Sequence, residues 1–255
     1  AIIKVWNLSE DTRKALDLKD VLKVRLEAGY ESRVSQIFLG QARYAYSIKD
    51  GPDIITEIRT GDNEKEIALN RCNLQFGKLT SPSIILNSLA SELKIPIGNL
   101  AQATKALAAS GKVLCPAATV FTGNAWRNMQ DFCRSAGLEC SIQDGKLLIL
   151  DIGFGIDTKA QQLYSESGLI GTPTVDSKGV VNAVCLMIPE VRPGTRINFD
   201  TLSVSGLYRV ETAEYQGNTF GNPWYIRLTC KPEGDPTLGQ KGKKNRAARV
   251  RTRAR

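Results

Sequence analysis

Residues 34–60, VSQIFLGQARYAYSIKDGPDIITEIRT, contain the pattern that decides the fold of the first part of the chain. Residues 34–46 are rich in β-branched and aromatic side chains, and residues 54–60 form a second run of strand-forming residues. The segment 49–52, KDGP, separates the two runs, and Asp-Gly between apolar runs is a strong hairpin signal. The stretch therefore predicts two antiparallel strands joined by a tight turn.

The residues before this hairpin continue the β pattern. Residues 1–8 are strand-like, and residues 21–29 alternate apolar with charged side chains, as in a half-buried strand. Between them, Ser9 precedes Glu10 and Asp11, and acidic groups in the first turn of a helix are stabilised by its dipole. The sequence thus predicts a short helix between the first two strands.

The middle of the chain changes to a mixed pattern. Pro82 opens a helix whose apolar residues fall on one face, and Pro96 ends it. A second helix is predicted over residues 124–136, and an alanine-rich helix over residues 101–110. Residues 140–150 contain another Asp-Gly turn between apolar runs, which predicts a second hairpin.

The last third returns to β structure. Turn-forming stretches, residues 192–195 and 217–223, separate apolar runs of strand length. This spacing is typical of a small barrel or sandwich. The predicted strands are residues 180–188, 195–199, 206–215 and 224–230.

These patterns predict a mainly β protein in which two β-barrel domains flank a small α+β region. The expected division is a first β-barrel domain at 1–80, an α/β insert at 81–160, a second β-barrel domain at 161–232 and a basic flexible segment at 233–255. The two β regions show no close sequence repeat.

The charge of the chain is concentrated at its C-terminus. The formal net charge is +8, but residues 241–255 hold eight basic and no acidic residues, so the preceding 240 residues are neutral. A folded nucleic-acid-binding domain is expected to carry a basic face, and this one shows no excess of positive charge. The candidate contacts to nucleic acid or a partner are Lys241, Lys243, Lys244, Arg246, Arg249, Arg251, Arg253 and Arg255.

The residue types present argue against an enzyme. The chain contains no histidine, which removes the commonest general base and metal ligand. None of the six cysteines forms a CxxC pair, so we expect no metal site, no cofactor and no catalytic residue. Reduced, buried thiols are the favoured interpretation of the cysteines, and a secreted disulfide framework is the alternative. The sequence shows neither a signal peptide nor an apolar run of membrane-spanning length.

Three segments together resemble the baseplate hub proteins of tailed phages. The first is residues 3–13, IKVWNLSEDTR, and the second is residues 24–30, VRLEAGY, with 37–40 and 51–56 following it. The third runs from residues 191–194, VRPG, through GLYRV at 206–210 to YQGNTFGNPWY at 215–225. Their order and spacing carry the resemblance, which covers most of residues 1–232.

This resemblance implies a homotrimeric structural hub without catalysis. Each subunit of such a hub offers two tail-tube-like β-barrels, so three copies make a ring of six that adapts a six-fold tail tube to a three-fold spike or tail tip. The implied surroundings are DNA or the tape-measure protein in the central channel, and the implied location is the virion after assembly in the host cytoplasm. Family members usually have further strands upstream, so we expect either that the first barrel is incomplete at its N-terminus or that the numbering starts late.

Two other classes of function remain open at this point. A nucleic-acid-binding module would act through the basic segment, since each phosphate neutralised adds salt-dependent affinity. The neutral body argues against it. A cell-wall-degrading enzyme of a tail tip would need a pair of catalytic carboxylates, and the closest candidates, Glu211 and Glu214, are expected to point to opposite faces of a strand.

Overall fold

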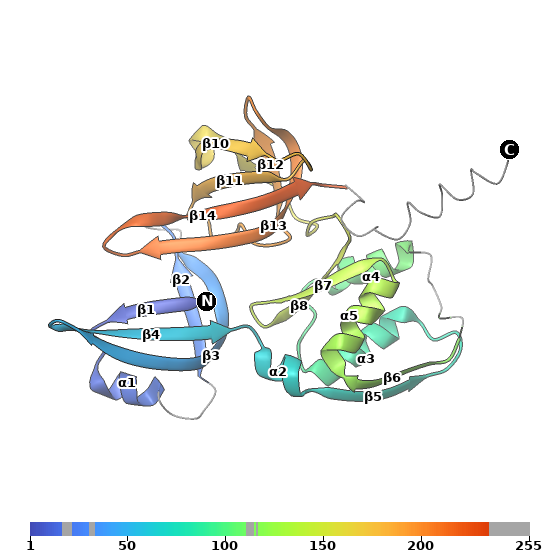
Figure 1. Ribbon diagram of the computed structural model, residues 1–255. Coiled ribbons are helices and arrows are strands. Elements are labelled where there is room, and N and C mark those ends of the chain that lie inside the picture. Colours follow the sequence, from blue (N-terminus) through green and yellow to red (C-terminus); the bar gives the residue numbers. More distant parts are fainter. Residues whose placement is uncertain (17–21, 31–33, 111–114, 116, 235–255) are drawn as a thin grey trace.

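The computed structural model describes residues 1–16, 22–30, 34–110, 115 and 117–234 (Figure 1). Two β-sheets lie at the start and the end of the chain, and the middle region holds most of the helices. In chain order the elements are β1 (Ile2–Trp6), α1 (Glu10–Leu16), β2 (Lys23–Ala28), β3 (Ser35–Asp50), β4 (Asp53–Gly61), α2 (Glu64–Leu69), β5 (Arg71–Phe76), α3 (Pro82–Leu93), α4 (Leu100–Ala109), β6 (Thr119–Asn124), α5 (Ala125–Ser135), β7 (Leu138–Gln143), β8 (Lys146–Asp151), β9 (Gln161–Leu163), η2 (Ser165–Ser167), β10 (Leu169–Val175), β11 (Val181–Leu186), β12 (Arg196–Asp200), β13 (Ser205–Asn218) and β14 (Gly221–Pro232).

The first sheet has four antiparallel strands in the order β1-β4-β3-β2. Its centre is the predicted hairpin, in which Asp50 lies opposite Asp53 and Gly51 has a positive φ of 58°. The predicted helix α1 lies between β1 and β2, and the backbone N–H of Thr12 donates to Ser9 Oγ at 3.2 Å. The hairpin and the short helix that the sequence predicts are therefore both present.

The middle region is built around a core of its own. Helices α3, α4 and α5 pack on two strand pairs, β5 with β6 and β7 with β8. Pro82 is the first residue of α3 and Lys94 ends the helix in the left-handed conformation. The fully buried side chains of this core include Ile85, Leu86, Leu89, Leu93, Met129, Leu147 and Ile149. The three predicted helices and the second hairpin are confirmed.

Strand β5 was not expected from the sequence. It lies inside the range 1–80 that was expected to form the first β domain, yet it pairs with β6 along its whole length. Cys72 of β5 is buried in the middle core. By strand pairing, the change from the first sheet to the middle region therefore falls after Gly61.

The second sheet has six strands in the order β10-β11-β14-β13-β12-β9. All neighbours are antiparallel except β9, which runs parallel to β12. Strands β9 and β10 lie at the two edges, and neither was predicted. The fully buried side chains include Leu163, Val181, Cys185, Ile197, Phe199, Val210, Ile226 and Cys230.

The predicted fold class is confirmed at its coarse level, a mainly β chain with a mixed α/β middle region. The two closed barrels are not seen, because both sheets remain open among the described residues: β1 and β2 end the first sheet, and β10 and β9 end the second. A barrel needs its edge strands to pair with each other, and these edges do not. The described chain ends at Gly234, whose N–H donates to the carbonyl of Gly153 at 3.0 Å.

Candidate assembly site

The four central strands of the second sheet repeat the first sheet. The first sheet has the order β1-β4-β3-β2, and the second contains β11-β14-β13-β12 in the same places. The order along the chain is also the same, because each set begins with an outer strand, crosses to the opposite edge and returns through a long hairpin. The hairpins β3–β4 and β13–β14 extend toward the same side of the molecule (Figure 1).

The pairing registers of the two sets agree residue by residue over most of their length. In the first hairpin the register shifts at Arg43, which is an extra residue on β3. In the second hairpin it shifts at Glu211, which is an extra residue on β13. Both bulges lie seven positions before the last residue of their strand, Asp50 or Asn218. Because a β-bulge bends and twists the strand that carries it, the two hairpins share a local shape as well as an order.

The edges of the two repeated sets differ. In the second sheet, β10 pairs with the outer edge of β11 and β9 pairs with the outer edge of β12. In the first sheet the corresponding edges, on β1 and β2, have no paired strand among the described residues. Exposed edges of this kind are templates for pairing with another chain.

The backbone of β1 shows which groups face the open edge. Ala1 and Thr60 exchange two hydrogen bonds, one from each backbone nitrogen, and the Asn7 N–H donates to the Ile54 carbonyl. Since hydrogen-bonded pairs alternate along an antiparallel ladder, the N–H and C=O groups of Ile2, Lys4 and Trp6 point away from β4. These groups are therefore available to a further strand.

The outer face of the first sheet carries four exposed large apolar side chains beside the charged residues Lys4, Glu57 and Arg59. Ile2, Trp6, Tyr44 and Ile48 lie on the same face and are 63%, 45%, 48% and 57% exposed. At the corresponding positions of the second sheet lie Asn182, Leu186, Thr212 and Gln216. At these four positions the first sheet is apolar and the second is mostly polar, which marks the first sheet as the stronger candidate for a contact surface.

A charged cluster joins the second sheet to the middle region. Arg209 of β13 is only 8% exposed and forms an ion pair with Glu139 of β7. Glu211 lies 3.6 Å from Arg209 and 3.4 Å from Lys231, atom to atom across each ion pair. Burial raises the pKa of the Glu139 carboxyl, and the Arg209 guanidinium opposes that rise. Glu214, by contrast, is exposed, and its carboxylate accepts a hydrogen bond from Gln216 Nε2 at 2.7 Å.

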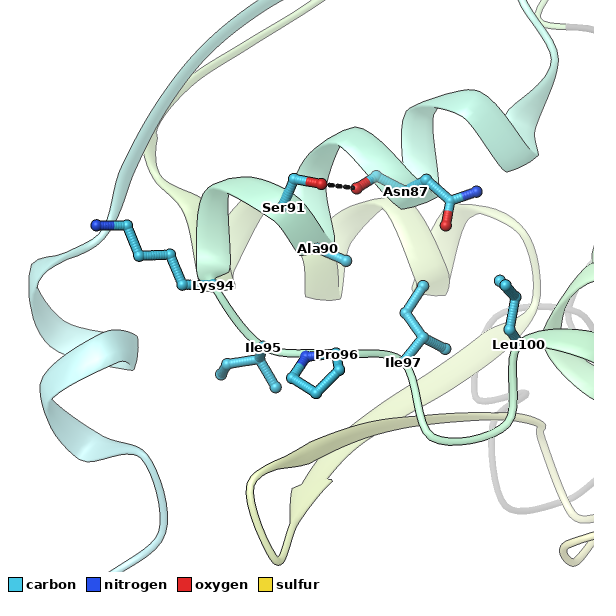
Figure 2. Close-up of a pocket in the computed structure, with 8 residues that line it drawn as sticks. All are labelled: Asn87, Ala90, Ser91, Lys94, Ile95, Pro96, Ile97 and Leu100. Atoms are coloured by element: carbon cyan, nitrogen blue, oxygen red, sulfur yellow. Dashed lines mark hydrogen bonds between the residues drawn. The ribbon is translucent and has the colours of Figure 1, made fainter.

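Two hollows lie outside these surfaces. The smaller, of about 310 Å³, runs along α3 beside residues 95–97 (Figure 2). At its polar rim, Ser91 Oγ donates a hydrogen bond to the Asn87 carbonyl of the same helix at 2.9 Å. The side chain of Lys94 points away from the hollow. The larger, of about 760 Å³, lies where the two sheets and the middle region meet. It is lined by Gln36, Leu39, Gly98, Gln143, Asp144, Lys146, Leu148, Ile156, Thr158, Lys159, Gln161, Glu190, Arg192 and Thr195.

The described residues offer little for metal or thiol chemistry. No group of three or more Cys, Asp or Glu side chains in this part of the chain is placed to hold a metal ion. All six cysteines are free, and burial raises the pKa of both Cys185 and Cys230 to about 12, which keeps these thiols protonated at neutral pH. Within the described residues, no helix is long and apolar enough to span a membrane.

The basic residues that the sequence singled out lie outside the described part of the chain. Lys241, Lys243, Lys244, Arg246, Arg249, Arg251, Arg253 and Arg255 all follow Gly234, the last described residue. Sequence reasoning also missed Asp144, Arg192 and Arg209. The sequence identifies Asp144 and Arg192 only as turn residues. The local pattern does not show whether a turn residue forms an ion pair with a distant residue or faces solvent.

Comparisons with known proteins point to phage tails. A family model described as "Baseplate hub gp41" matches residues 2–230. The structure resembles the crystal structure of the 43 kDa tail protein of prophage MuSo2 from Shewanella oneidensis, with a TM-score of 0.55, 9% sequence identity, and coverage of 91% of this chain and 89% of that one. It also resembles the tail protein from Neisseria meningitidis MC58, with a TM-score of 0.52, 10% identity, and coverage of 79% and 83%. No match is found among curated proteins.

Proposed function

The chain belongs to the baseplate hub gp41 family and has a structural role in a phage tail, and on that premise we propose that three copies close into a ring. In this ring the repeated sheets of each copy supply two similar units, so that three copies present six. Such a ring adapts a six-fold tail tube on one face to a three-fold spike or tail tip on the other. Its function is geometric, and it needs no catalytic residue.

The observation that carries this proposal is the repetition of strand order, register and bulge between β1–β4 and β11–β14. A closed three-fold assembly built from chains with two similar units has approximate six-fold symmetry. Two unrelated sheets in one chain would not give that match. The repeat is therefore what connects the fold of one chain to the symmetry of the proposed ring.

The open edges of the first sheet give the ring a means of closure. In the second sheet, strands β10 and β9 cover the positions that are open on β1 and β2. We propose that strands of neighbouring copies cover the open edges in the assembly and complete the barrel-like units. Edge pairing supplies directional backbone hydrogen bonds, and it would remove an exposed edge that otherwise favours aggregation.

The proposed ring surrounds the channel through which DNA passes. The partners on its two faces are the tail tube protein and the spike or tail-tip protein, and the location is the virion after assembly in the host cytoplasm. The basic segment 241–255 is proposed to contact DNA or the tape-measure protein, because eight positive charges without acidic neighbours attract polyanions.

The first test is the mass of the purified assembly at low and high salt, with and without residues 241–255. We expect a trimer that survives both high salt and removal of the segment, because the folded sheets hold it together. A salt-sensitive monomer that binds nucleic acid only through the segment would instead support a nucleic-acid-binding module. Cleavage of cell-wall glycan or peptide by the purified chain would contradict a purely structural role.

A further inference from the structure

The tip of the β7–β8 hairpin lies between the two repeated sheets (Figure 1). The tip consists of Asp144 and Gly145, which have positive φ angles of 52° and 73° and connect Gln143 to Lys146 in a two-residue turn. The larger hollow opens beside it. This turn belongs to the middle region, yet it contacts residues of both sheets.

The contacts to the first sheet are made through carboxylates. Asp144 Oδ1 accepts a hydrogen bond from the backbone N–H of Leu39 in β3 at 3.0 Å. Asp62, which directly follows β4, accepts the N–H of Gly145 through Oδ1 at 3.2 Å. Leu39 and Asp62 come from either side of the β3–β4 hairpin. The tip is thus attached to the first sheet at two separate points.

The contacts to the second sheet involve the segment that leads into β12. The guanidinium of Arg192 forms an ion pair with Asp144 through Oδ2, and Gln143 Nε2 donates to the Pro193 carbonyl at 3.1 Å. Arg192 also donates to the Gln36 carbonyl of β3. The side chains of Arg192 and Asp144 are 28% and 16% exposed, so solvent screens this pair less than it screens a surface pair.

Other contacts between the sheets include apolar packing and a neutral hydrogen bond. Ala28 and Ile37 of the first sheet pack on the core of the second, and the Tyr30 hydroxyl donates to the Trp224 carbonyl at 3.3 Å. Apolar packing is non-directional, whereas a charge-assisted hydrogen bond fixes both distance and angle. The chain connects the sheets only through the middle region, from residue 62 to the start of β9, so their angle depends on noncovalent contacts.

We propose that Asp144 and Arg192 are positioning residues that fix the angle between the two repeated sheets, and so the angle at which copies meet in the ring. The first part of this proposal concerns the single chain, and only the second part rests on the proposed function. Asp144 is suited to the task because one of its oxygens binds Leu39 of β3 and the other binds Arg192, in the segment that leads into β12.

The test measures the angle directly in the full-length chain. Lys49 and Thr219, exposed positions near the tips of the two long hairpins, are replaced by a keto-bearing amino acid and labelled with nitroxides, which leaves the six native thiols unmodified. Pulsed electron paramagnetic resonance on labelled chain mixed with an excess of unlabelled chain then gives the distribution of distances between the two labels of one copy. We expect a single narrow peak for the parent chain, and loss of that peak for both Asp144→Ala and Arg192→Ala.

Two further variants separate positioning from general damage. Asp144→Asn keeps an oxygen for the Leu39 N–H and loses the charge, so its distribution should be intermediate. Asp131→Asn removes the exposed ion pair between Asp131 and Arg134 on α5, whose oxygen and nitrogen lie 3.0 Å apart, and should leave the peak unchanged. Near-ultraviolet circular dichroism confirms that each variant is folded. A narrow, unshifted peak in both alanine variants of the junction overturns the proposal.

The mass of the assembly tests whether the angle between the sheets affects how copies associate. With a looser junction, we expect trimer association to weaken by about tenfold, because ordering the junction is then added to the cost of assembly. A broadened distance distribution with unchanged trimer association would overturn the link to ring closure and leave the angle assignment standing. A parent chain that never forms a trimer counts against the proposed ring, while the distance measurement still decides the role of the two residues.

Discussion

The two repeated sheets share one pattern of strand pairing but have different interiors. In the second, Ile197, Phe199 and Val210 are 1% exposed or less. The corresponding residues of the first, Val24, Leu26 and Ala42, are only half-buried. Strand order, register and bulge thus persist although the packing differs. Backbone hydrogen bonding and alternation of side chains define the pairing, whereas complete burial in the second sheet also depends on its added strands and loops.

The two sheets also differ in polarity at one pair of corresponding positions. Ser47 and Thr56 lie opposite each other in the first sheet, with their hydroxyl oxygens 3.0 Å apart. Tyr215 and Ile226 occupy these places in the second sheet. Because Ser47 is exposed and only Thr56 is buried, this hydroxyl pair contributes less burial than Tyr and Ile. We therefore expect the second sheet to be the more stable of the two in an isolated chain.

The largest expected effect is from Phe199→Ala. This side chain is 1% exposed and meets the Tyr208 ring edge to face, so its loss should lower the free energy of unfolding by about 3–5 kcal/mol. The matched variant Leu26→Ala should cost only about 1 kcal/mol, because Leu26 is half-buried. Urea denaturation followed by circular dichroism measures both. Equal losses would show that the first sheet is as well packed as the second.

Arg209→Ala should have the next largest effect, about 2 kcal/mol. It leaves the half-buried Glu139 carboxylate without its cation. The corresponding residue of the first sheet is Gln41, which donates to Glu66 at 3.1 Å, and Gln41→Ala should cost less because no buried charge is stranded. Thermal unfolding of the two variants under the same conditions gives the comparison.

The Arg209→Ala loss should also depend on pH. Burial already raises the Glu139 pKa, and without the guanidinium it should rise further. A carboxyl with a raised pKa in the folded chain binds a proton more tightly there than in the unfolded chain, so stability recovers as the pH falls. We expect the loss to shrink between neutral pH and about pH 5. A loss that grows on acidification would contradict this account of the cluster.

Proline substitutions test the difference between the edges. Val184 of β11 corresponds to Lys4 of β1. The backbone N–H and C=O groups of Val184 face β10, because Leu186, two residues further along β11, donates its N–H to the Gly168 carbonyl on that side at 2.8 Å. Val184→Pro should cost about 2 kcal/mol, because it removes a ladder hydrogen bond. Lys4→Pro should change the stability of the single chain by less than about 1 kcal/mol.

Lys4→Pro should nevertheless weaken the trimer, which is measured by its mass across a dilution series. Lys4→Ala is the control, because it removes the same side chain and keeps the outward N–H. If both variants assemble like the parent chain, the β1 edge takes no part in closure.

The smallest expected effect on stability is from replacing two outer-face residues of the first sheet with the residues at the corresponding positions of the second sheet. Ile2→Asn with Tyr44→Thr introduces the residues found at the corresponding positions, Asn182 and Thr212. Both native side chains are largely exposed, so the free energy of unfolding should change by no more than about 0.5 kcal/mol for each. Association with other copies or tail proteins should decrease if this face is a contact surface. Unchanged association in a reconstituted tail would exclude that role.

Much of the local structure could be predicted from the sequence. The turns at Asp50-Gly51 and Asp144-Gly145 and the helix that begins at Pro82 were predictable because their signals lie within a few residues. Strands β9 and β10 were not, because β9 has only three residues and β10 shows no clean alternation of buried and exposed positions. The contacts of Asp144 with Leu39 and Arg192 span 105 and 48 positions, beyond any local pattern.

By itself, the sequence determined a mainly β fold with a mixed α/β middle region, its main hairpins and helices, the neutral charge of residues 1–240 and, through its motifs, the resemblance to a phage tail hub. These properties depend on composition, on local turn chemistry and on the spacing of apolar residues. Only the tertiary structure decided that β11–β14 repeat β1–β4, which edges stay open and which charges meet at the junction. Register, bulges and long-range ion pairs are set by segments far apart in the chain, and dissimilar side chains support the same backbone pairing in both sheets.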